Sequence, residues 1–274
     1  MTALLSSPGS GGTPIVMGIL NVTPDSFSDG GKHLKQEQAV NHALDMIAEG
    51  ADVIDVGGES TRPGADPVTL EEELDRVLPV IEAIRRISDI PISVDTYKST
   101  VAREALAVGA DMVNDISFGE FDEAILQVAA DAGACYIGMH MKGTPRNMQF
   151  NPVYNNVLKE VTAYLKIRAD LVAAAGVRPE RILVDPGIGF GKTDVHNLAL
   201  LQGIPTLCDT GYPVAIGTSR KSMFGRLLKL DMHDRLVPSV LSAVMAWQKG
   251  ASLVRVHDVR ETVLALKTAR LLCE

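Results

Sequence analysis

The feature that most constrains this chain is an eightfold alternation of a short apolar run with a longer amphipathic segment. The short runs have the length of buried strands, whereas the longer segments repeat apolar residues every three or four positions, as helices do. We predict strands at 15–20, 53–56, 92–94, 112–114, 135–139, 182–184, 214–217 and 253–256. We predict helices at 38–49, 70–87, 99–108, 122–132, 153–175, 195–202, 222–228, 236–249 and 260–272.

Alternating strands and helices indicate a parallel sheet with right-handed crossovers. Eight such units in 274 residues favour a single α/β domain, the (β/α)8 TIM barrel. The alternative is a doubly wound open sheet, which usually has fewer strands, and no G-x-G-x-x-G motif follows the first run. We place the barrel at 15–274, after a flexible N-terminal segment at 1–14.

A weak internal repeat accompanies four of the strands, each of which is preceded by a Gly-Ala pair. Five residues beyond the glycines lie Asp55, Asn114, Gly138 and Arg255. Three of these four are polar within otherwise apolar runs, and because strand side chains alternate faces, we expect them to share an orientation. In a barrel that orientation is most simply the lumen. The alternative is that each is a separately paired buried polar group.

Composition excludes several classes of protein. The chain has 34 acidic and 26 basic residues and a net charge of −8, so we expect no binding to nucleic-acid backbones, although a local cationic pocket could hold a small anion. Three scattered cysteines form neither a disulfide framework nor a thiolate zinc site, and they favour a cytoplasmic protein. No signal peptide or membrane-spanning apolar stretch is recognisable, so we expect no membrane partner.

Cations mark the carboxyl ends of the last two predicted strands, where barrel enzymes commonly bind phosphate. Lys221 follows the seventh strand, and Arg255 and His257 lie on the eighth. Ser222 begins a predicted helix whose free N–H groups also favour an anion. Arg62 stands in a loop that faces the same mouth. For His257 the alternative is a core histidine that is hydrogen-bonded locally.

Two carboxylates further restrict the class of ligand that this mouth could bind. Asp95 and Asp185 end different strands and can face each other across the mouth. Paired carboxylates are also typical of glycosidases, but the only tryptophan, Trp247, lies in a predicted helix, and platforms for sugars are lacking. With Asn114, the two carboxylates could instead hold a planar heterocycle that has several N–H donors.

One further motif needs to be excluded. Gly191-Lys192-Thr193 is similar to the end of a Walker A loop. The first glycine of that motif would fall on Pro186, so the spacing argues against nucleotide hydrolysis.

Taken in order, the loops after the strands resemble those of the dihydropteroate synthase family, which is inhibited by sulfonamide drugs. Each short segment is unspecific, but their order and spacing from Met17 to Thr262 are highly specific. The two strongest segments are 17–31 and 57–64, and the supporting segments are 93–96, 114–116, 139–141, 185–187, 219–222 and 255–258.

The resemblance implies a transferase of folate biosynthesis that joins a dihydropterin methyl pyrophosphate to p-aminobenzoate and releases pyrophosphate. It implies a pterin site of Asp95, Asn114, Asp185, Lys221, Phe190 and Met139. It implies a pyrophosphate site of Asn21, Thr61, Arg62, Arg255 and His257, with Asn21 also a ligand of Mg²⁺. The implied p-aminobenzoate contacts are Phe27, Thr61, Pro63, Lys221 and Ser222, and the implied catalytic residues are Asp95, Lys221, Arg62 and Asp29. A homodimer is also implied.

Two alternatives remain at this point. A pterin-dependent methyltransferase would share Asp95, Asn114 and Asp185, but it would have no use for Arg62 and Lys221 together. A non-catalytic pterin-binding paralogue should have lost some of the anion ligands, which are all present here.

Overall fold

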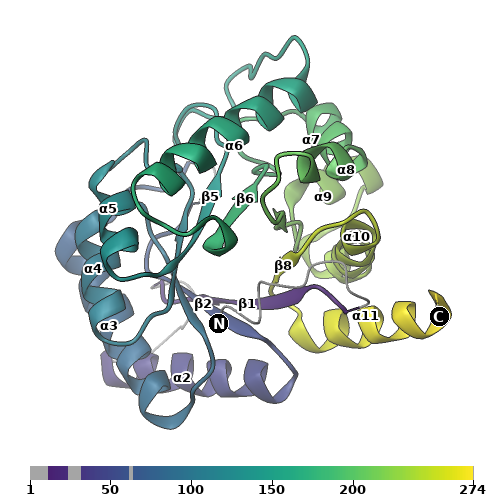
Figure 1. The fold of residues 1–274 in the computed structure, drawn as a ribbon. Helices are drawn as coiled ribbons and strands as arrows, with labels where there is room; N and C mark the ends of the chain where they lie inside the picture. Colours follow the sequence, from purple (N-terminus) through teal and green to yellow (C-terminus); the bar gives the residue numbers. More distant parts are fainter. Residues whose placement is uncertain (1–11, 24–31, 62–63, 274) are drawn as a thin grey trace.

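The structure is a computed structural model that describes residues 12–23, 32–61 and 64–273. Eight strands alternate with helices along the chain (Figure 1). The strands are β1 (Ile15–Asn21), β2 (Val53–Gly57), β3 (Ile92–Asp95), β4 (Met112–Asp115), β5 (Cys135–Met139), β6 (Ile182–Asp185), β7 (Ala215–Ile216) and β8 (Leu253–Val256). The helices are α2 (Lys32–Ala48), α3 (Leu70–Ile87), α4 (Ser99–Ala107), α5 (Ala124–Asp131), α6 (Val157–Ala174), α7 (Asp194–Gln202), α8 (Ile204–Cys208), α9 (Ser222–Leu228), α10 (Leu236–Gln248) and α11 (Val259–Cys273).

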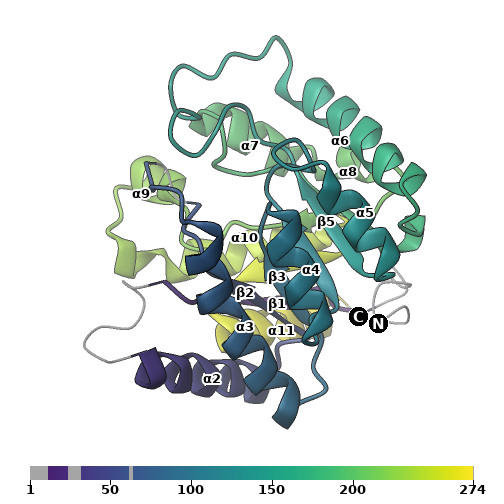
Figure 2. The ribbon, with the colours of Figure 1, turned by 90° about the vertical axis from the view of Figure 1, so that its left-hand side faces the viewer.

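The strands form one parallel sheet that closes on itself. Their order is β6-β5-β4-β3-β2-β1-β8-β7, so each strand pairs with its neighbours in sequence except at the two ends. A parallel bridge between Val184 and Val214 joins these ends, and the Val184 N–H donates to the Pro213 carbonyl at 2.9 Å. The helices surround the strands in both side views (Figures 1 and 2). The predicted TIM barrel is therefore confirmed.

Most element boundaries follow local chemistry that is visible in the sequence. Helix α3 occupies the predicted range because Thr69 and Glu72 form a capping box at its start. Helix α6 begins four residues later than predicted, since the Asn156 side chain caps it by accepting from the Lys159 N–H at 3.0 Å. The predicted start of α2 was also too late, and α8 was missed.

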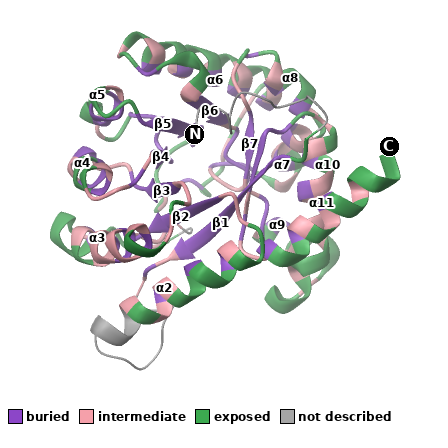
Figure 3. Cartoon of the chain, turned by 60° about the horizontal axis from the view of Figure 1, so that its bottom comes forward, coloured by how far each residue is buried: buried purple, intermediate pink, exposed green. Residues whose placement is uncertain are grey.

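Apolar side chains in the lower part and polar side chains toward the carboxyl end fill the described lumen. Buried apolar residues from seven strands form the lower layer: Ile15, Met17, Val53, Met112, Cys135, Ile137, Leu183, Ala215 and Leu253. The opposite faces of the strands pack against the buried sides of the helices, which expose their outer faces (Figure 3). The next inward-pointing residues along several strands are polar, so the upper layer forms a charged floor at the carboxyl end of the barrel.

The predicted polar positions are inward at three of four strands. Side-chain contacts bring together Asp55, Asn114 and Arg255, as the repeat indicated. Gly138 differs, because its neighbour Ile137 belongs to the lumen layer and Gly138 therefore faces the helices. A Cβ at Gly138 would lie 2.0 Å from the Phe118 ring, which explains why a glycine stands there.

None of the helices among the described residues is long and apolar enough to cross a membrane.

Candidate active site

A hydrogen-bonded network joins the ends of four strands at the carboxyl mouth of the barrel. Arg255 on β8 donates from Nε to Asp55 Oδ2 on β2 at 2.6 Å and from Nη2 to Asp95 Oδ2 on β3 at 2.7 Å. Asn114 on β4 donates from Nδ2 to the same Asp55 oxygen at 3.0 Å. The network therefore fixes the orientation of three residues that were predicted to bind substrate.

Asp55 was not predicted as a site residue, although the repeat marked its position. Its side chain is fully buried, and its Oδ1 atom has no hydrogen-bond partner among the described residues. Because the nitrogen of the Asn114 amide donates to Asp55, the carbonyl oxygen of that amide is the atom turned away from Asp55. Asn114 is thus set to present an acceptor rather than a donor.

Burial raises the pKa of Asp95 to about 7, against the attraction of Arg255 and with the repulsion of Asp55, Glu73 and Asp115. Burial also opposes the charge of Arg255, but the two aspartates prevail and raise its pKa. The guanidinium therefore stays charged, and the Asp95 carboxyl holds its proton more tightly than an exposed aspartate does.

Asp185 ends β6 and begins the sharply wound loop 185–192. The Gly187 N–H donates to its Oδ1 atom at 2.7 Å. Gly187 has a φ of +68°, and a Cβ there would lie 2.0 Å from the His140 carbonyl oxygen, so only glycine permits this turn. Burial raises the pKa of Asp185, although the Gly187 hydrogen bond and the charges of Lys221, Lys192 and Arg255 oppose the shift.

Lys221 immediately precedes α9 and lies against the same loop. Its Nζ atom is 4.3 Å from the centroid of the Phe190 ring, a cation–π contact. Burial lowers its pKa to about 8, while the negative charges of Asp185 and Asp95 act in the opposite direction. The ammonium group thus lies within the field of both predicted pterin carboxylates.

An apolar wall completes the mouth. Met139, Ile116, Met141 and Met148 form a buried cluster, against which Tyr97 and Phe190 pack. Thioether and aromatic side chains suit a flat ring, because sulfur is polarisable and adaptable. Acceptor oxygens beside such a wall suit a planar heterocycle that carries N–H donors.

Those predicted anion ligands that the structure describes lie at the same mouth. His257 follows β8, and both its backbone N–H and its Nδ1 atom contact Ser219 Oγ, at 3.1 Å and 3.0 Å. Asn21 ends β1 and is half-buried, as is Thr61 in the loop after β2. Ser222 is the exposed first residue of α9, and its hydroxyl accepts from Arg226 at 2.9 Å.

Arg255 is less open to an anion than the sequence predicted. Its side chain is 25% exposed, and its Nε and Nη2 atoms donate to Asp55 and Asp95, which leaves Nη1 to contact an anion. Four predicted residues, Phe27, Asp29, Arg62 and Pro63, lie outside the described residues.

A second network, which the sequence did not indicate, holds the loop that carries Thr61. Lys98 Nζ donates to Glu59 Oε2 at 2.6 Å and also to Glu73, while Tyr97 donates to Glu59 at 2.9 Å. Burial works against the Lys98 charge, but the hydrogen bonds that Lys98 donates to Glu59 and Glu73 raise its pKa. The base of this loop is therefore tied to α3 and to the end of β3.

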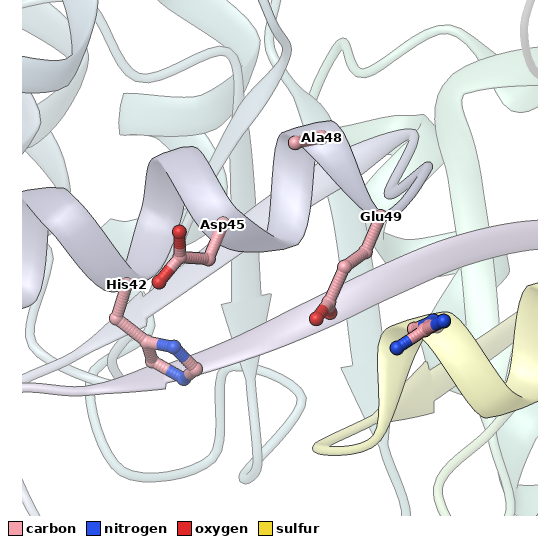
Figure 4. A pocket seen from close by; sticks show the side chains of 5 residues that line it. His42, Asp45, Ala48 and Glu49 are labelled. Carbon is pink, nitrogen blue, oxygen red and sulfur yellow. The ribbon is translucent and has the colours of Figure 1, made fainter.

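A separate hollow of about 560 Å³ lies away from the mouth, on the outer surface. It is lined by His42, Asp45 and Ala48 of α2, by Glu49 directly after that helix and by Arg260 of α11 (Figure 4). Across the part of the chain that the structure describes, no three His, Cys, Asp or Glu side chains are grouped to hold a metal ion. We assign no function to this hollow.

The fold and this mouth define a barrel enzyme that binds a pterin. A family model described as pterin binding enzyme matches residues 17–257, and the chain belongs to that family. Its similar relatives are dihydropteroate synthases. That of Haemophilus influenzae is 47% identical over 254 residues, which cover 93% of this chain and 92% of the relative.

Solved structures of dihydropteroate synthases are also similar to this chain. The Xanthomonas albilineans dihydropteroate synthase with 4-aminobenzoic acid has a TM-score of 0.90 and 45% identity, over 96% of this chain and 94% of that one. The Yersinia pestis dihydropteroate synthase in a sulfonamide drug complex has a TM-score of 0.90 and 44% identity, over 97% of this chain and 96% of that one.

Proposed function

We propose that this chain catalyses the dihydropteroate synthase reaction of folate biosynthesis. A dihydropterin methyl pyrophosphate condenses with p-aminobenzoate to give dihydropteroate and pyrophosphate. The observation that carries the proposal is the set of three oxygen acceptors on β3, β4 and β6: Asp95, the Asn114 carbonyl oxygen and Asp185. A pterin ring presents several N–H donors along its edges, and these three side chains can accept from them.

The chemistry requires a leaving group more than a base. The bond between the pterin methylene carbon and the pyrophosphate oxygen breaks, and its electron pair leaves with pyrophosphate. The arylamine nitrogen then bonds to the methylene carbon and loses a proton. Negative charge at Asp95 and Asp185 stabilises the positive charge that develops on the ring. The arylamine is already neutral at pH 7, so positioning dominates.

The cations at the mouth suit the departing anion. Arg255 and His257 lie at the end of β8, and the Lys221 ammonium lies within the electrostatic field of Asp185 and Asp95. We assign the pyrophosphate to Arg255, His257, Asn21 and Thr61, together with Arg62, and we read His257 as an anion ligand rather than a base. Guanidinium and ammonium groups are well suited to phosphate oxygens.

The donor set fits a magnesium ion that arrives with the substrate. Asn21 offers one neutral oxygen, and Mg²⁺ usually takes only one or two protein ligands beside phosphates and waters. Asn21 would therefore hold the ion on the protein side. When bound, Mg²⁺ would neutralise charge on the departing pyrophosphate.

We assign p-aminobenzoate to the rim of the mouth, with Thr61, Lys221 and Ser222 among its contacts, together with Phe27 and Pro63. A sulfonamide that resembles p-aminobenzoate would occupy the same place. The relatives that bind 4-aminobenzoic acid and a sulfonamide drug support this assignment.

We propose further that the chain forms a homodimer through its last helices. Apolar side chains that are 37–82% exposed gather on α10 and α11: Leu236, Val237, Leu241, Met245, Leu264, Leu271 and Leu272. A patch of this kind marks a protein interface. The three cysteines are free, which fits the reducing cytoplasm that we propose for the protein.

Release of pyrophosphate tests the proposed reaction. We expect release only when the pterin pyrophosphate and p-aminobenzoate are both present, with one dihydropteroate formed per pyrophosphate. A methyltransferase or a non-catalytic binding protein would release none, and release without p-aminobenzoate would indicate a hydrolase.

A further inference from the structure

A fully buried lysine lies beneath the pterin site, where the mechanism above does not use it. Lys192 is 1% exposed, and its Nζ atom contacts three acceptors. These are His140 Nδ1 at 2.9 Å, the His140 carbonyl oxygen at 3.2 Å and the Phe190 carbonyl oxygen at 2.9 Å. An ammonium group has three donors, so this set satisfies it completely. Burial lowers the pKa of Lys192 to about 7, while the charge of Asp185 acts in the opposite direction. Because burying a charge is costly, an ammonium group held by three acceptors in this position requires a reason.

The three contacts join two neighbouring loops. His140 follows β5 directly, and its N–H donates to the Asp185 carbonyl at 2.9 Å, which continues the strand pairing into the loop. Phe190 and Lys192 belong to the loop 185–192 after β6. Lys192 therefore ties the end of β5 to the far end of this loop.

The loop lies too close to its neighbour to tolerate side chains. Gly187, Gly189 and Gly191 all have positive φ. A Cβ at Gly187 would lie 2.0 Å from the His140 carbonyl oxygen, and one at Gly191 would lie 2.4 Å from the Lys142 carbonyl oxygen. Backbone thus packs directly on backbone, and the Lys192 ammonium bonds the carbonyl groups at this contact.

The same loop carries or supports the groups that face the substrate. Asp185 begins it and is held by the Gly187 N–H. Phe190 lies under the Lys221 ammonium, and a Cβ at Gly189 would be 3.4 Å from Lys221 Cδ. A shift of the loop would move Asp185 and Lys221 together.

We propose that Lys192 is a positioning residue for the pterin substrate, which as a buried ammonium tied to neutral His140 holds the loop that places Asp185 and Lys221. This inference rests on the function proposed above. It assigns Lys192 a larger effect on the pterin end of the site, where Asp185 and Lys221 both act, than on the p-aminobenzoate end, where only Lys221 acts.

The surroundings of His140 determine its protonation state and its tautomer. Nδ1 faces the Lys192 ammonium and must accept, so the ring proton is on Nε2. Burial lowers the pKa of His140 to about 3, and the charges of Lys192 and Lys142 act in the same direction. Tyr164 lies edge-on to the ring at 4.7 Å, and Tyr154 lies at 6.1 Å. His140 therefore remains neutral at physiological pH.

Lys192→Met tests the proposal, because it keeps the length of the side chain and removes both charge and donors. Lys166→Met, at an exposed lysine on α6 paired with Asp170, is the matched control. We expect the variant to raise KM for the pterin pyrophosphate about tenfold or more, and KM for p-aminobenzoate by less than about threefold. The control should change neither. Equal changes for both substrates, or a change in kcat alone, would overturn the proposal.

A spectroscopic readout separates this inference from the proposed reaction. In the wild type, ¹⁵N shifts of His140 should report the neutral Nε2–H tautomer from about pH 5 to about pH 6, below the pKa of about 7 at which Lys192 loses its proton. In Lys192→Met, the Nδ1 shift should lose the signature of an acceptor bonded to a charged donor. If the wild type shows no synthase activity but His140 behaves in this way, the proposed reaction is wrong, whereas the link that Lys192 makes between the two loops is confirmed. An unchanged His140 signal in the variant would show that Lys192 does not link the two loops through His140.

Lys192→Gln covers the case in which Lys192→Met does not fold. Glutamine keeps two N–H donors for the carbonyl groups of His140 and Phe190 but carries no charge. We expect it to fold and to show a smaller, pterin-specific rise in KM. A folded Lys192→Gln protein with wild-type KM values and a wild-type His140 signal would contradict the role of the ammonium.

Discussion

Asp185→Asn is the substitution that most sharply tests the pterin floor. Asparagine has nearly the same shape, and its Oδ1 atom can still accept the Gly187 N–H at the 2.7 Å position. The second oxygen, however, becomes an NH₂ group that faces the N–H donors of the pterin. Loss of a charged acceptor should cost about 2–4 kcal/mol of binding. This corresponds to a rise in Kd of roughly 30-fold to 1,000-fold.

The fold itself should tolerate this change. Burial raises the pKa of Asp185, so the folded state holds the carboxyl proton more tightly than the unfolded state. A raised acid pKa means that ionisation of Asp185 lowers stability as the pH rises above its ordinary value. The neutral asparagine avoids that cost, and Asp185→Asn should be at least as stable as the wild type at pH 7.

Calorimetry with a pterin analogue, without p-aminobenzoate, measures the change in binding affinity. Thermal unfolding measures the change in stability of the fold. Asp170→Asn, at an exposed aspartate of α6, is the control and should bind the analogue normally. Affinity of Asp185→Asn equal to that of the wild type would refute the assignment of Asp185. Weak binding together with a large loss of stability would show instead that the change had damaged the fold.

Three further predictions concern the floor and the cations. Asp55→Asn should free the Asn114 amide to turn and weaken a pterin analogue by about 1–3 kcal/mol, measured by calorimetry; an unchanged affinity would show that Asp55 does not set the amide. Affinity for the analogue should rise with pH as Asp95 ionises near its pKa of about 7. It should fall again as Lys221 loses its proton near its pKa of about 8. A flat profile from about pH 5 to about pH 10 would contradict both roles. Arg255→Ala should weaken both ligands, because it removes the hydrogen bonds that hold Asp55 and Asp95, but it should weaken pyrophosphate more than a phosphate-free pterin. Removal of Mg²⁺ should mimic part of the additional loss of pyrophosphate binding. Equal weakening of both ligands would make Arg255 purely structural.

Local signals explain why the fold could be predicted. Each strand is a short apolar run that ends at polar residues, and a capping box fixes the start of α3. The start of α6 was misplaced because Val153 looks like part of the apolar face, whereas the Asn156 cap decides where the helix begins. Helix α8 is too short to show a period, and it starts one residue before a proline.

The site was predictable only where residue type and strand position carry the information. Asp95, Asn114, Asp185 and Arg255 stand at strand ends, so sequence order alone places them at one mouth. The supporting partners lie far away along the chain, as in the contact of Arg255 with Asp55, which are 200 residues apart. Lys192 gave only the false signal of a nucleotide loop, because its acceptors are a ring nitrogen and two backbone carbonyls.

The most direct test of the account is an experimental structure of this chain with a pterin and p-aminobenzoate bound together. We predict that the N–H edges of the pterin lie within hydrogen-bond distance of Asp95, Asp185 and the Asn114 carbonyl oxygen, with the Asn114 nitrogen still on Asp55. The p-aminobenzoate should lie at the rim, with its amine directed toward the pterin methylene. A pterin bound elsewhere, or one that contacts none of the three acceptors, would contradict the central claim.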